Sequence, residues 1–429
     1  MPPPESRSVE APRLDHTSGR DGPARQASLR EHNLALVMAT IVRADVRGRP
    51  IPRSRIAAET GLTKATVSEL ADLLISAHLV QELDPDAPAR AGRPATPLAP
   101  AARTVVGLGL SVAVGHLCAT VVDLTGMTLT QRIVEADLRR CDPTRTLQRL
   151  ARLGGETIHD VAGQGASVAG ACVSVPGLVN RLTGAVRYAP NLDWTDVDVP
   201  TMMRTHAAIA DLPVFVANDA DLSARNEIRE RVIQRAADSA EDQSFLYVYG
   251  AIGIGSALVV DGRVFRGLHG FAGEIGHSVV EPAGPVCSCG ATGCLELYAG
   301  RQALLATAGL EPTTALESLV EHLDVQSVRT APALSAAARA LGQIASTVLN
   351  VVDIDDVVLG GDYRQLYDHL ASGVGAELQA RVLGSRLHPP TVRRALGGPY
   401  SDARGGALTI LDAVIRDPTA WVDRVLALA

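Results

Sequence analysis

The chain has 429 residues, of which 46% are hydrophobic, a net charge of −7, and no apolar run of the roughly 18 residues needed to span a membrane. The length suits two or three domains, and the acidic balance excludes a protein that coats nucleic acid over its whole surface. Residues 1–100 carry 13 Lys and Arg against 12 Asp and Glu, and the remainder carries 27 against 35. This distribution favours a small, local DNA contact in the first hundred residues.

The first 27 residues contain Pro and Arg but lack the apolar stretch typical of a signal peptide, so we expect a disordered tail. Without a secretion signal we expect a cytoplasmic protein with no membrane partner. In that reducing compartment, clustered Cys and His are more typical of metal binding than of disulfides.

Residues 28–100 are predicted to form a winged helix-turn-helix DNA-binding domain. Apolar residues recur at helical spacing over 29–44, and Ser54 is expected to cap a short helix that runs to Glu59. Gly61 then supplies a tight turn before the next helix. The apolar seam shared by these helices would contain Ile56, Ala57, Leu62, Val67, Leu70 and Leu74.

The second helix of this unit is expected to enter the major groove of DNA. Thr63 is a suitable N-cap for a helix over 64–77. Its early polar residues Lys64, Thr66 and Ser68 would be exposed and could reach phosphates or base edges.

Two wing strands are predicted over 79–83 and 96–99, joined by the loop 84–94. Arg93, in the Gly-Arg-Pro sequence of that loop, resembles short arginine hooks that insert into a minor groove. The alternative is a Pro- and Ala-rich linker with one exposed arginine.

The composition shifts after Ala102 to strand-forming runs that alternate with helical segments, and 104–429 is predicted to be an α/β body. Two β-hairpins open two halves of this body, with a cleft between two lobes. A polar pair, Asn218 and Asp219, follows one strand and opens a helix, which is where α/β folds place ligand contacts. The segments that indicate strands are 104–126, 165–180, 211–228, 244–267 and 353–363.

Three segments together resemble the ROK family, named for repressors, open reading frames and kinases. They are NDADLSARNE at 218–227, GIGSALVVDGRVFRGLHGFAGEIGH at 253–277 and CSCGATGCLE at 287–296, and the likeness extends over roughly 104–415. The resemblance implies an actin-like ATPase fold of two lobes, a sugar-binding cleft and a dimer. ROK members with an N-terminal winged helix-turn-helix are sugar-responsive transcriptional regulators.

The same resemblance implies a structural zinc site at His277, Cys287, Cys289 and Cys294. The donor chemistry agrees, because three thiolates and one imidazole make a closed tetrahedral zinc site without a position for catalytic water. The alternative is three buried free cysteines.

The resemblance also implies which residues hold the sugar. In family kinases the aspartate at the position of Asp219 is the general base, and here it is interpreted as a ligand-binding residue. Carboxylates suit a polyhydroxylated ligand because each accepts two hydroxyl donors. For any one of these residues, the alternative is a surface carboxylate or a helix N-cap. The implied set is Asn191, Asn218, Asp219, Glu274, His277 and Glu296, with Asn191 the least secure match.

The sequence departs from the kinase members at their phosphate loop. Where those kinases carry an Asp-x-Gly-Gly-Thr-Lys type sequence, 111–116 reads Ser-Val-Ala-Val-Gly-His. The aspartate, both glycines and the lysine that serve phosphoryl transfer are all replaced. A second glycine loop at 250–255 remains but is weak evidence by itself. We therefore expect no kinase activity and no ATP cofactor.

These observations favour a sugar-responsive regulator, most simply a repressor of carbohydrate genes, which binds operator DNA as a homodimer or higher homo-oligomer. One alternative is a sugar kinase with a DNA-binding appendage. The other is a regulator whose input is a protein partner, or one that activates genes constitutively.

Overall fold

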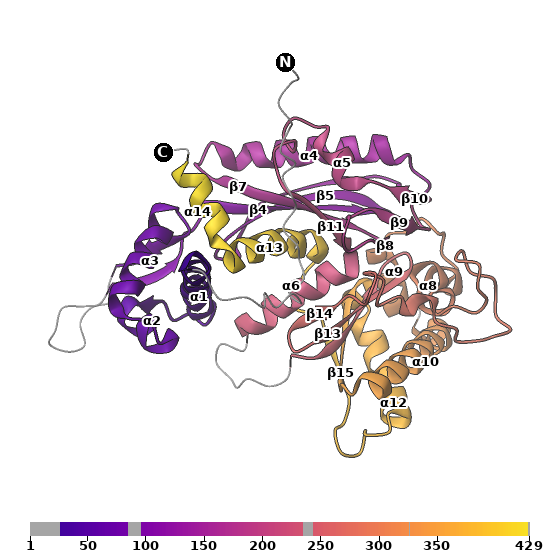
Figure 1. Cartoon of the computed structure of the whole chain (residues 1–429). Coiled ribbons are helices and arrows are strands. Elements are labelled where there is room, and N and C mark those ends of the chain that lie inside the picture. Colours follow the sequence, from indigo (N-terminus) through magenta and orange to yellow (C-terminus); the bar gives the residue numbers. More distant parts are fainter. Residues whose placement is uncertain (1–25, 85–95, 235–242, 326, 428–429) are drawn as a thin grey trace.

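The protein consists of two α/β lobes and an N-terminal helical head that packs against the first lobe (Figure 1). The computed structural model describes residues 26–84, 96–234, 243–325 and 327–427. None of its helices is long and apolar enough to cross a membrane within these residues.

The head contains three helices and a small sheet in the strand order β1-β3-β2. Gly61 ends the second helix in the left-handed conformation, at φ 74°. Thr63 caps the third helix as predicted, since its hydroxyl accepts a hydrogen bond from the Thr66 amide at 3.2 Å. The elements are α1 (Gln26–Val46), β1 (Ile51–Pro52), α2 (Arg53–Thr60), α3 (Lys64–Ser76), β2 (Val80–Glu82) and β3 (Pro97–Pro100).

The predicted cap at Ser54 is wrong. Helix α2 already begins at Arg53, and its N-cap position is Pro52, which provides no side-chain hydrogen bond. The two wing strands are confirmed, because Val80 pairs with Pro100 and Glu82 with Leu98 in an antiparallel ladder. Of the predicted seam, all members are buried except Leu62, which is partly buried.

The first lobe is built on a five-stranded sheet in the order β6-β5-β4-β7-β11. The first three strands form an antiparallel meander, and β7 and β11 run parallel to β4. The strands are β4 (Val105–Ala113), β5 (His116–Asp123), β6 (Thr128–Glu135), β7 (Ser167–Val175) and β11 (Val214–Asn218).

Two helices cover opposite faces of this sheet, α4 (Pro143–Ala162) and α13 (Ser401–Arg416) (Figure 1). The sequence of β4 explains the arrangement, because its leucines and valines alternate with Gly107 and Gly109. The apolar side chains pack under α4, whereas a Cβ at Gly109 would collide with the Ala403 carbonyl on α13. The glycines therefore let α13 lie close against the sheet.

The second lobe repeats the strand order of the first, as β14-β13-β12-β15-β16. Again three strands form an antiparallel meander, and two further strands run parallel to the first of them. The strands are β12 (Phe245–Gly250), β13 (Ile254–Val260), β14 (Arg263–Phe265), β15 (Asp356–Gly361) and β16 (Thr391–Arg394). The predicted two-lobed, actin-like α/β body is confirmed.

Helices connect and cover the lobes. Helix α6 (Asp219–Gln234) leaves the first lobe after β11 and packs against both α13 and β13. The second lobe carries α10 (Ser327–Val352) and α12 (Tyr367–Arg381), which pack against each other. Helix α13 then returns the chain to the first lobe.

The head and the first lobe share one continuous apolar core. It joins Val37 and Leu74 of the head to Leu411 of α13 and Trp421 of α14 (Pro418–Leu426). The Trp421 indole also donates a hydrogen bond to the Ala77 carbonyl at 3.2 Å. This packing ties the orientation of the head to the first lobe.

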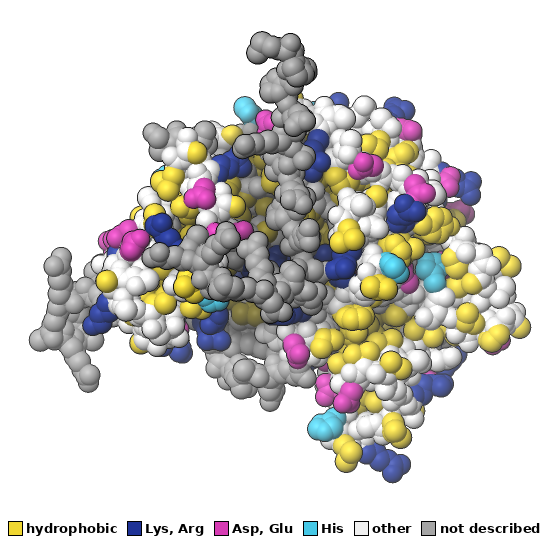
Figure 2. Space-filling model, in the orientation of Figure 1, with side chains coloured by type: hydrophobic (Ala, Val, Ile, Leu, Met, Phe, Trp, Pro, Cys, Tyr) yellow, Lys and Arg dark blue, Asp and Glu magenta, His cyan; other side chains and the backbone are white. Residues whose placement is uncertain are grey.

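Acidic and basic side chains are interspersed over the described part of the face drawn in Figure 2, and no continuous basic patch extends across it. This agrees with the uneven but modest charge of the sequence.

Candidate metal centre and ligand site

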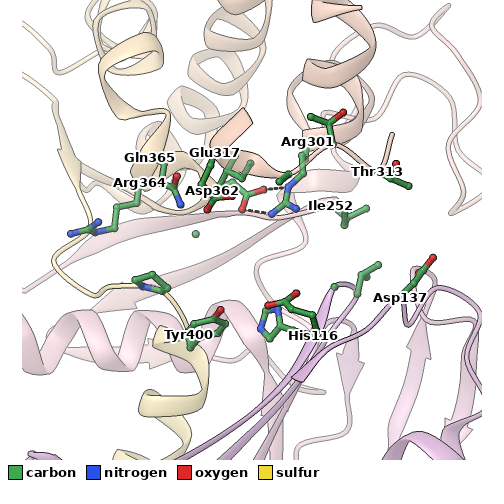
Figure 3. A pocket seen from close by; sticks show the side chains of 18 of the residues that line it. His116, Asp137, Ile252, Arg301, Thr313, Glu317, Asp362, Arg364, Gln365 and Tyr400 are labelled. Carbon is green, nitrogen blue, oxygen red and sulfur yellow. Dashed lines mark hydrogen bonds and ion pairs between the residues drawn. The ribbon is translucent and has the colours of Figure 1, made fainter. Parts of the chain in front are cut away.

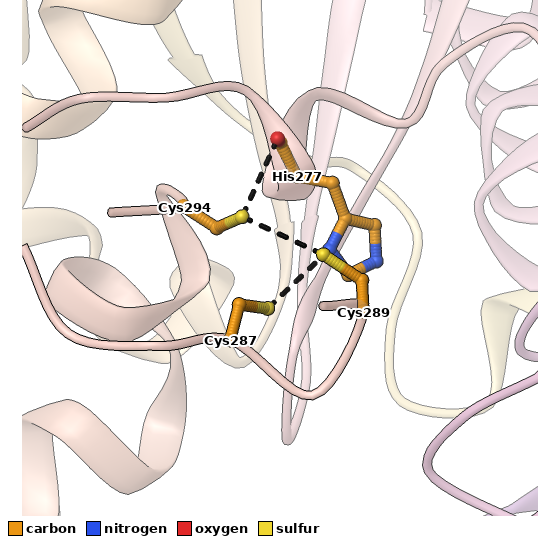
Figure 4. A group of neighbouring side chains, drawn as sticks. All are labelled: His277, Cys287, Cys289 and Cys294. Atoms are coloured by element: carbon orange, nitrogen blue, oxygen red, sulfur yellow. Dashed lines mark hydrogen bonds between the residues drawn. The ribbon is translucent and has the colours of Figure 1, made fainter. Parts of the chain in front are cut away.

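Four donor groups from one loop converge as the sequence predicted. The side chains of His277, Cys287, Cys289 and Cys294 have ligand atoms that all lie within 4.8 Å of one another (Figure 4). The Cys287 Sγ to His277 Nδ1 distance is 3.7 Å, as is the distance between the Sγ atoms of Cys289 and Cys294. A tetrahedral zinc with bonds of about 2.0–2.3 Å needs ligand atoms roughly 3.5–3.8 Å apart. The cluster therefore fits zinc in donor type and spacing.

The local backbone explains how this loop gathers its thiols. Gly290 lies at φ 93°, a conformation that L side chains rarely adopt, and its amide donates to the Cys287 carbonyl at 3.0 Å. The Cys287 amide in turn donates to Ala291 at 2.8 Å. Single bridges pair Val286 with Thr292 and Val279 with Cys294. These contacts fold 286–294 into a tight hairpin against His277.

His277 lies at the end of a short 3-10 helix (Ile275–His277) that follows Glu274. Its Nδ1 faces the thiols, and the other ring nitrogen lies on the far side of the ring, away from the cluster (Figure 4). One imidazole can therefore bind a metal with Nδ1 and leave Nε2 for another partner.

Asn218 and Asp219 lie where β11 ends and α6 begins. The Asn218 side-chain oxygen accepts from the amides of Ala220 and Asp221 at 2.8 and 3.3 Å, so this residue caps the helix. Its amide nitrogen donates to the Gly177 carbonyl at 3.1 Å. Asn218 thus has a structural role at the start of α6, and its sugar contact stays a prediction.

Asp219 and Glu274 face other carboxylates. Burial, the Asp402 carboxylate and Glu274 raise the pKa of Asp219 to about 7. Burial, Asp221 and Glu296 raise the pKa of Glu274 to about 7. These residues come from both lobes, so the structure gathers the predicted carboxylates in one place.

The second glycine loop lies against the same residues. A Cβ at Gly253 would lie 2.6 Å from Glu296 Oε2 and 3.3 Å from Asn191 Nδ2, and a Cβ at Gly255 would lie 3.8 Å from Asp219 Oδ1. Asn191, Asp219 and Glu296 therefore surround the turn between β12 and β13. Sequence reasoning treated this loop as weak evidence because glycine spacing alone does not reveal what approaches it.

Glu296 links the ligand set to the metal cluster. It is the first residue of α7 (Glu296–Ala299), two residues after Cys294. Its Oε1 accepts a hydrogen bond from Cys287 Sγ at 2.9 Å and lies 3.8 Å from His277 Nδ1. The loop that gathers the four candidate metal donors thereby also positions a predicted ligand carboxylate.

A cavity of about 640 Å³ lies between the lobes beside this set, and its lining includes none of the six predicted ligand residues. His116 and Tyr400 face Arg301 and Asp362 across it (Figure 3). The Arg301 guanidinium donates to both Asp362 oxygens at 2.5 and 2.6 Å. The cavity borders the 111–116 segment, so it corresponds to the phosphate side of the cleft.

That segment differs in structure as well as in sequence from a phosphate loop. Strand β4 ends at Ala113 and β5 begins at His116, which leaves a two-residue turn. Ser111 and Ser174 both donate hydrogen bonds to Asp402 Oδ2, at 2.5 and 2.7 Å. Sequence reasoning missed Asp402, whose only signal is an acidic residue in the first turn of α13, shortly before two glycines.

The predicted DNA-reading residues lie on α3. Lys64 is exposed, whereas Thr66 and Ser68 are half-buried, and the Thr66 hydroxyl lies 2.9 Å from the Thr63 hydroxyl. Arg93 lies outside the described residues.

Comparison with known proteins gives a consistent classification. The ROK family profile matches residues 108–412, and the chain therefore belongs to the ROK family. The xylose repressor of Bacillus subtilis strain 168 is 26% identical over 360 residues, which cover 84% of this chain and 89% of the repressor.

Solved structures agree on the fold. A crystal structure of a ROK family transcriptional regulator, a homologue of the Escherichia coli MLC protein, matches with a TM-score of 0.74 and 22% identity. The match covers 94% of this chain and 100% of that regulator. The ROK hexokinase from Thermus thermophilus matches with a TM-score of 0.55 and 25% identity, over 72% of this chain and 99% of the kinase. Repressors and kinases thus share this body, and the match to the regulator extends into the head.

Proposed function

We propose that this chain is a sugar-responsive transcriptional repressor that binds operator DNA through its head and a sugar in the cleft between its lobes. The observation that carries the proposal is the position of α6. This helix begins at Asp219 beside the gathered carboxylates and packs on α13, whose apolar face belongs to the core shared with the head. A ligand that changes the lobe arrangement can therefore change the orientation of the head.

The proposed ligand contacts are those of Asn191, Asp219, Glu274 and Glu296, with His277 Nε2 as a further partner. Carboxylates with two acceptor oxygens each suit a ligand that carries many hydroxyl donors. The Asn218 amide would hold the helix start in place and could still donate its second hydrogen. The relative named xylose repressor supports a sugar as the class of effector.

We propose that zinc occupies the His277, Cys287, Cys289 and Cys294 cluster in a structural role. Four protein donors complete a tetrahedron, so the ion has no open position for chemistry. Its role would be to fix the loop that carries His277 and Glu296.

On DNA we propose a cytoplasmic homodimer, or a higher homo-oligomer, that places one head on each half of a palindromic operator. Lys64, Thr66 and Ser68 would lie at the major groove, and Arg93 at the minor groove. Sugar binding would favour one arrangement of the lobes, change the spacing between the heads and so release the operator.

The test is Asp219→Ala in the full-length protein. The variant should bind the operator as the wild type does and should no longer respond to the sugar that releases the wild type. Asp211→Ala, an exposed residue before β11, is the matched control and should respond normally. A normal response of Asp219→Ala would mean that the assigned site is wrong.

The same purified protein separates the alternatives. We expect no sugar-dependent release of ADP from ATP, because the turn between β4 and β5 lacks the glycines and lysine of a phosphate loop. ADP release that depends on one sugar would instead favour a kinase with a DNA-binding appendage. A broad sugar panel without any thermal shift would favour control by a protein partner.

A further inference from the structure

The titratable side chains that gather at the proposed ligand site are mainly carboxylates. The carboxylates of Asp402 and Glu274 both lie close enough to Asp219 to act on its charge, and the Asp402 side chain is almost wholly buried. Two serine hydroxyls, from Ser111 and Ser174, hold Asp402 in place through the same carboxylate oxygen. The acid is therefore fixed, and it cannot turn away from an approaching ligand without losing both hydrogen bonds.

Four arginines around this set have acidic partners of their own. Among the described residues, Arg266 Nε lies 3.6 Å from Asp221, and Arg225 pairs with Asp412 at 2.7 Å. Arg301 donates from Nε and from one terminal nitrogen to the two oxygens of Asp362, and Arg404 pairs with Glu230. An anionic group on a ligand would therefore have to compete with an existing carboxylate for each of these cations.

The charge and the shape of the region around 111–116 also disfavour an anionic group. Helix α13 approaches β4 so closely that its first turn places Asp402 beside Ser111, at the start of the former phosphate loop. The two-residue turn that follows offers no open glycine loop whose amides could bind a phosphate. A phosphate that extended from a sugar past Asp219 would meet Asp402 there.

We propose that the effector is an uncharged sugar, and that the site rejects phosphorylated sugars and sugar acids, with Asp402 as a specificity-determining residue. This inference rests on the proposed function and narrows its ligand class. Hydroxyl groups donate hydrogen bonds to carboxylates, whereas an anionic group that reaches Asp402 has no hydrogen to donate to it and faces another carboxylate. Two like charges roughly 5 Å apart in a partly buried site reduce affinity at least about a hundredfold.

The test is calorimetric titration of the full-length protein with matched pairs of ligands. Each pair contains a neutral sugar and an anionic form that keeps its ring: glucose with glucose 6-phosphate, glucose with glucuronate, and N-acetylglucosamine with its 6-phosphate. At least one neutral sugar should bind, and its anionic counterparts should bind at least about a hundredfold more weakly. Equal or tighter binding of an anionic form would overturn the inference and leave the proposed regulator intact. Binding of no member at all would overturn the proposed function, and the inference with it.

The variant Asp402→Asn tests the residue itself. An amide oxygen still accepts from Ser111 and Ser174, so the local geometry can persist while the charge is removed. The ratio of neutral to anionic affinity should fall by about tenfold or more. Asp423→Asn, an exposed position on α14, makes the same charge change far from the ligand site and should leave the ratio unchanged. An unchanged ratio in folded Asp402→Asn would remove Asp402 from the account. If that variant does not fold, the ligand pairs on the wild type still decide the charge selectivity.

Discussion

The two lobes share one strand order, but their first hairpins have become different structures. In the first lobe, β4 and β5 are joined by a two-residue turn, and Ser111 at its base is bound to a buried carboxylate. In the second lobe, Gly253 ends the turn between β12 and β13 and Gly255 lies at the start of β13, and three ligand candidates lie against these glycines. The comparison teaches that one strand order can carry two different hairpins, a tight closed turn in the first lobe and a glycine-containing turn in the second. The first lobe packs against the head and carries Asn218 and Asp219, and the second lobe carries the remaining predicted carboxylates and the Cys/His cluster.

The largest effect is expected from the metal cluster, which has no counterpart among the described residues of the first lobe. Cys289→Ser removes one exposed thiolate donor. Zinc content should fall from about one ion per chain to nearly none, and the melting temperature should fall by about 10 °C or more, since structural zinc contributes many kcal/mol to folding. Elemental analysis and a thermal melt measure both.

Cys141→Ser is the matched control, because Cys141 is a partly buried cysteine outside the cluster. Its zinc content should equal that of the wild type. Full zinc retention by Cys289→Ser would contradict the assigned donor set.

The second effect concerns the first-lobe hairpin. Ser111→Asp restores the residue type that ROK kinases carry there, but places a second carboxylate beside buried Asp402. The free energy of unfolding should fall by about 3 kcal/mol or more at pH 8, because two buried like charges lack a cation between them. At pH 5 the loss should be smaller, since the introduced acid can stay protonated.

Urea denaturation of the variant at both pH values measures this difference. Ser111→Ala, which deletes one hydrogen bond without adding charge, should cost only about 1 kcal/mol at either pH. Equal stability of Ser111→Asp and the wild type at pH 8 would show that this part of the lobe still accommodates kinase chemistry.

The third effect compares corresponding hairpin glycines directly. In Gly253→Ala the new methyl group would lie 2.6 Å from Glu296 Oε2, so the carboxylate must move and effector affinity should fall by about tenfold. In Gly115→Ala of the first lobe, the methyl group meets nothing within 4 Å, so affinity should not change. Titration of both variants with the effector tests the contrast, and equal effects at the two positions would refute it.

The smallest effect is a pH dependence of stability. Because the pKa of Asp219 is raised to about 7 from its ordinary value of 3.8, its contribution to stability is full at pH below about 4 and is lost as pH rises through 7. Asp219→Asn mimics the neutral acid at every pH. The ligand-free variant should melt a few degrees above the wild type at pH 8 and much closer to it at pH 5.

Asp211→Asn, which is exposed, should follow the wild-type profile. Parallel melting curves of Asp219→Asn and the wild type across this pH range would contradict the buried carboxylate cluster.

Much of this architecture could be predicted from local sequence signals. Runs of strand-forming residues separated by turns located the hairpins, and the Thr63 and Gly61 signals located the ends of the head helices. Ser54 misled because a capping residue type also occurs within a first helical turn, where Arg53 had already begun the helix. The order of the strands within each sheet is set by pairing between segments far apart in the chain, which no local pattern encodes.

The candidate site divides in the same way. The cysteines and His277 are close in sequence, so the resemblance to ROK sequences identified the whole donor set, and the donor chemistry agreed. Asp402 meets Ser111 only because α13 crosses back to the first lobe, 291 residues later in the chain. The close approach of Gly253 and Gly255 to the predicted ligand residues likewise depends on how the lobes meet.

The central claim is that the chain recognises specific DNA and releases it in response to a sugar. The most direct test is to incubate the purified protein with fragmented DNA of its own genome, with and without added sugars, and to sequence the fragments that it retains. The account predicts enrichment of a palindromic site beside genes for sugar uptake or catabolism, and loss of that enrichment when the right sugar is present. Retention of no specific sequence under any of these conditions would contradict it, and sugar-dependent ADP release would then become the next measurement.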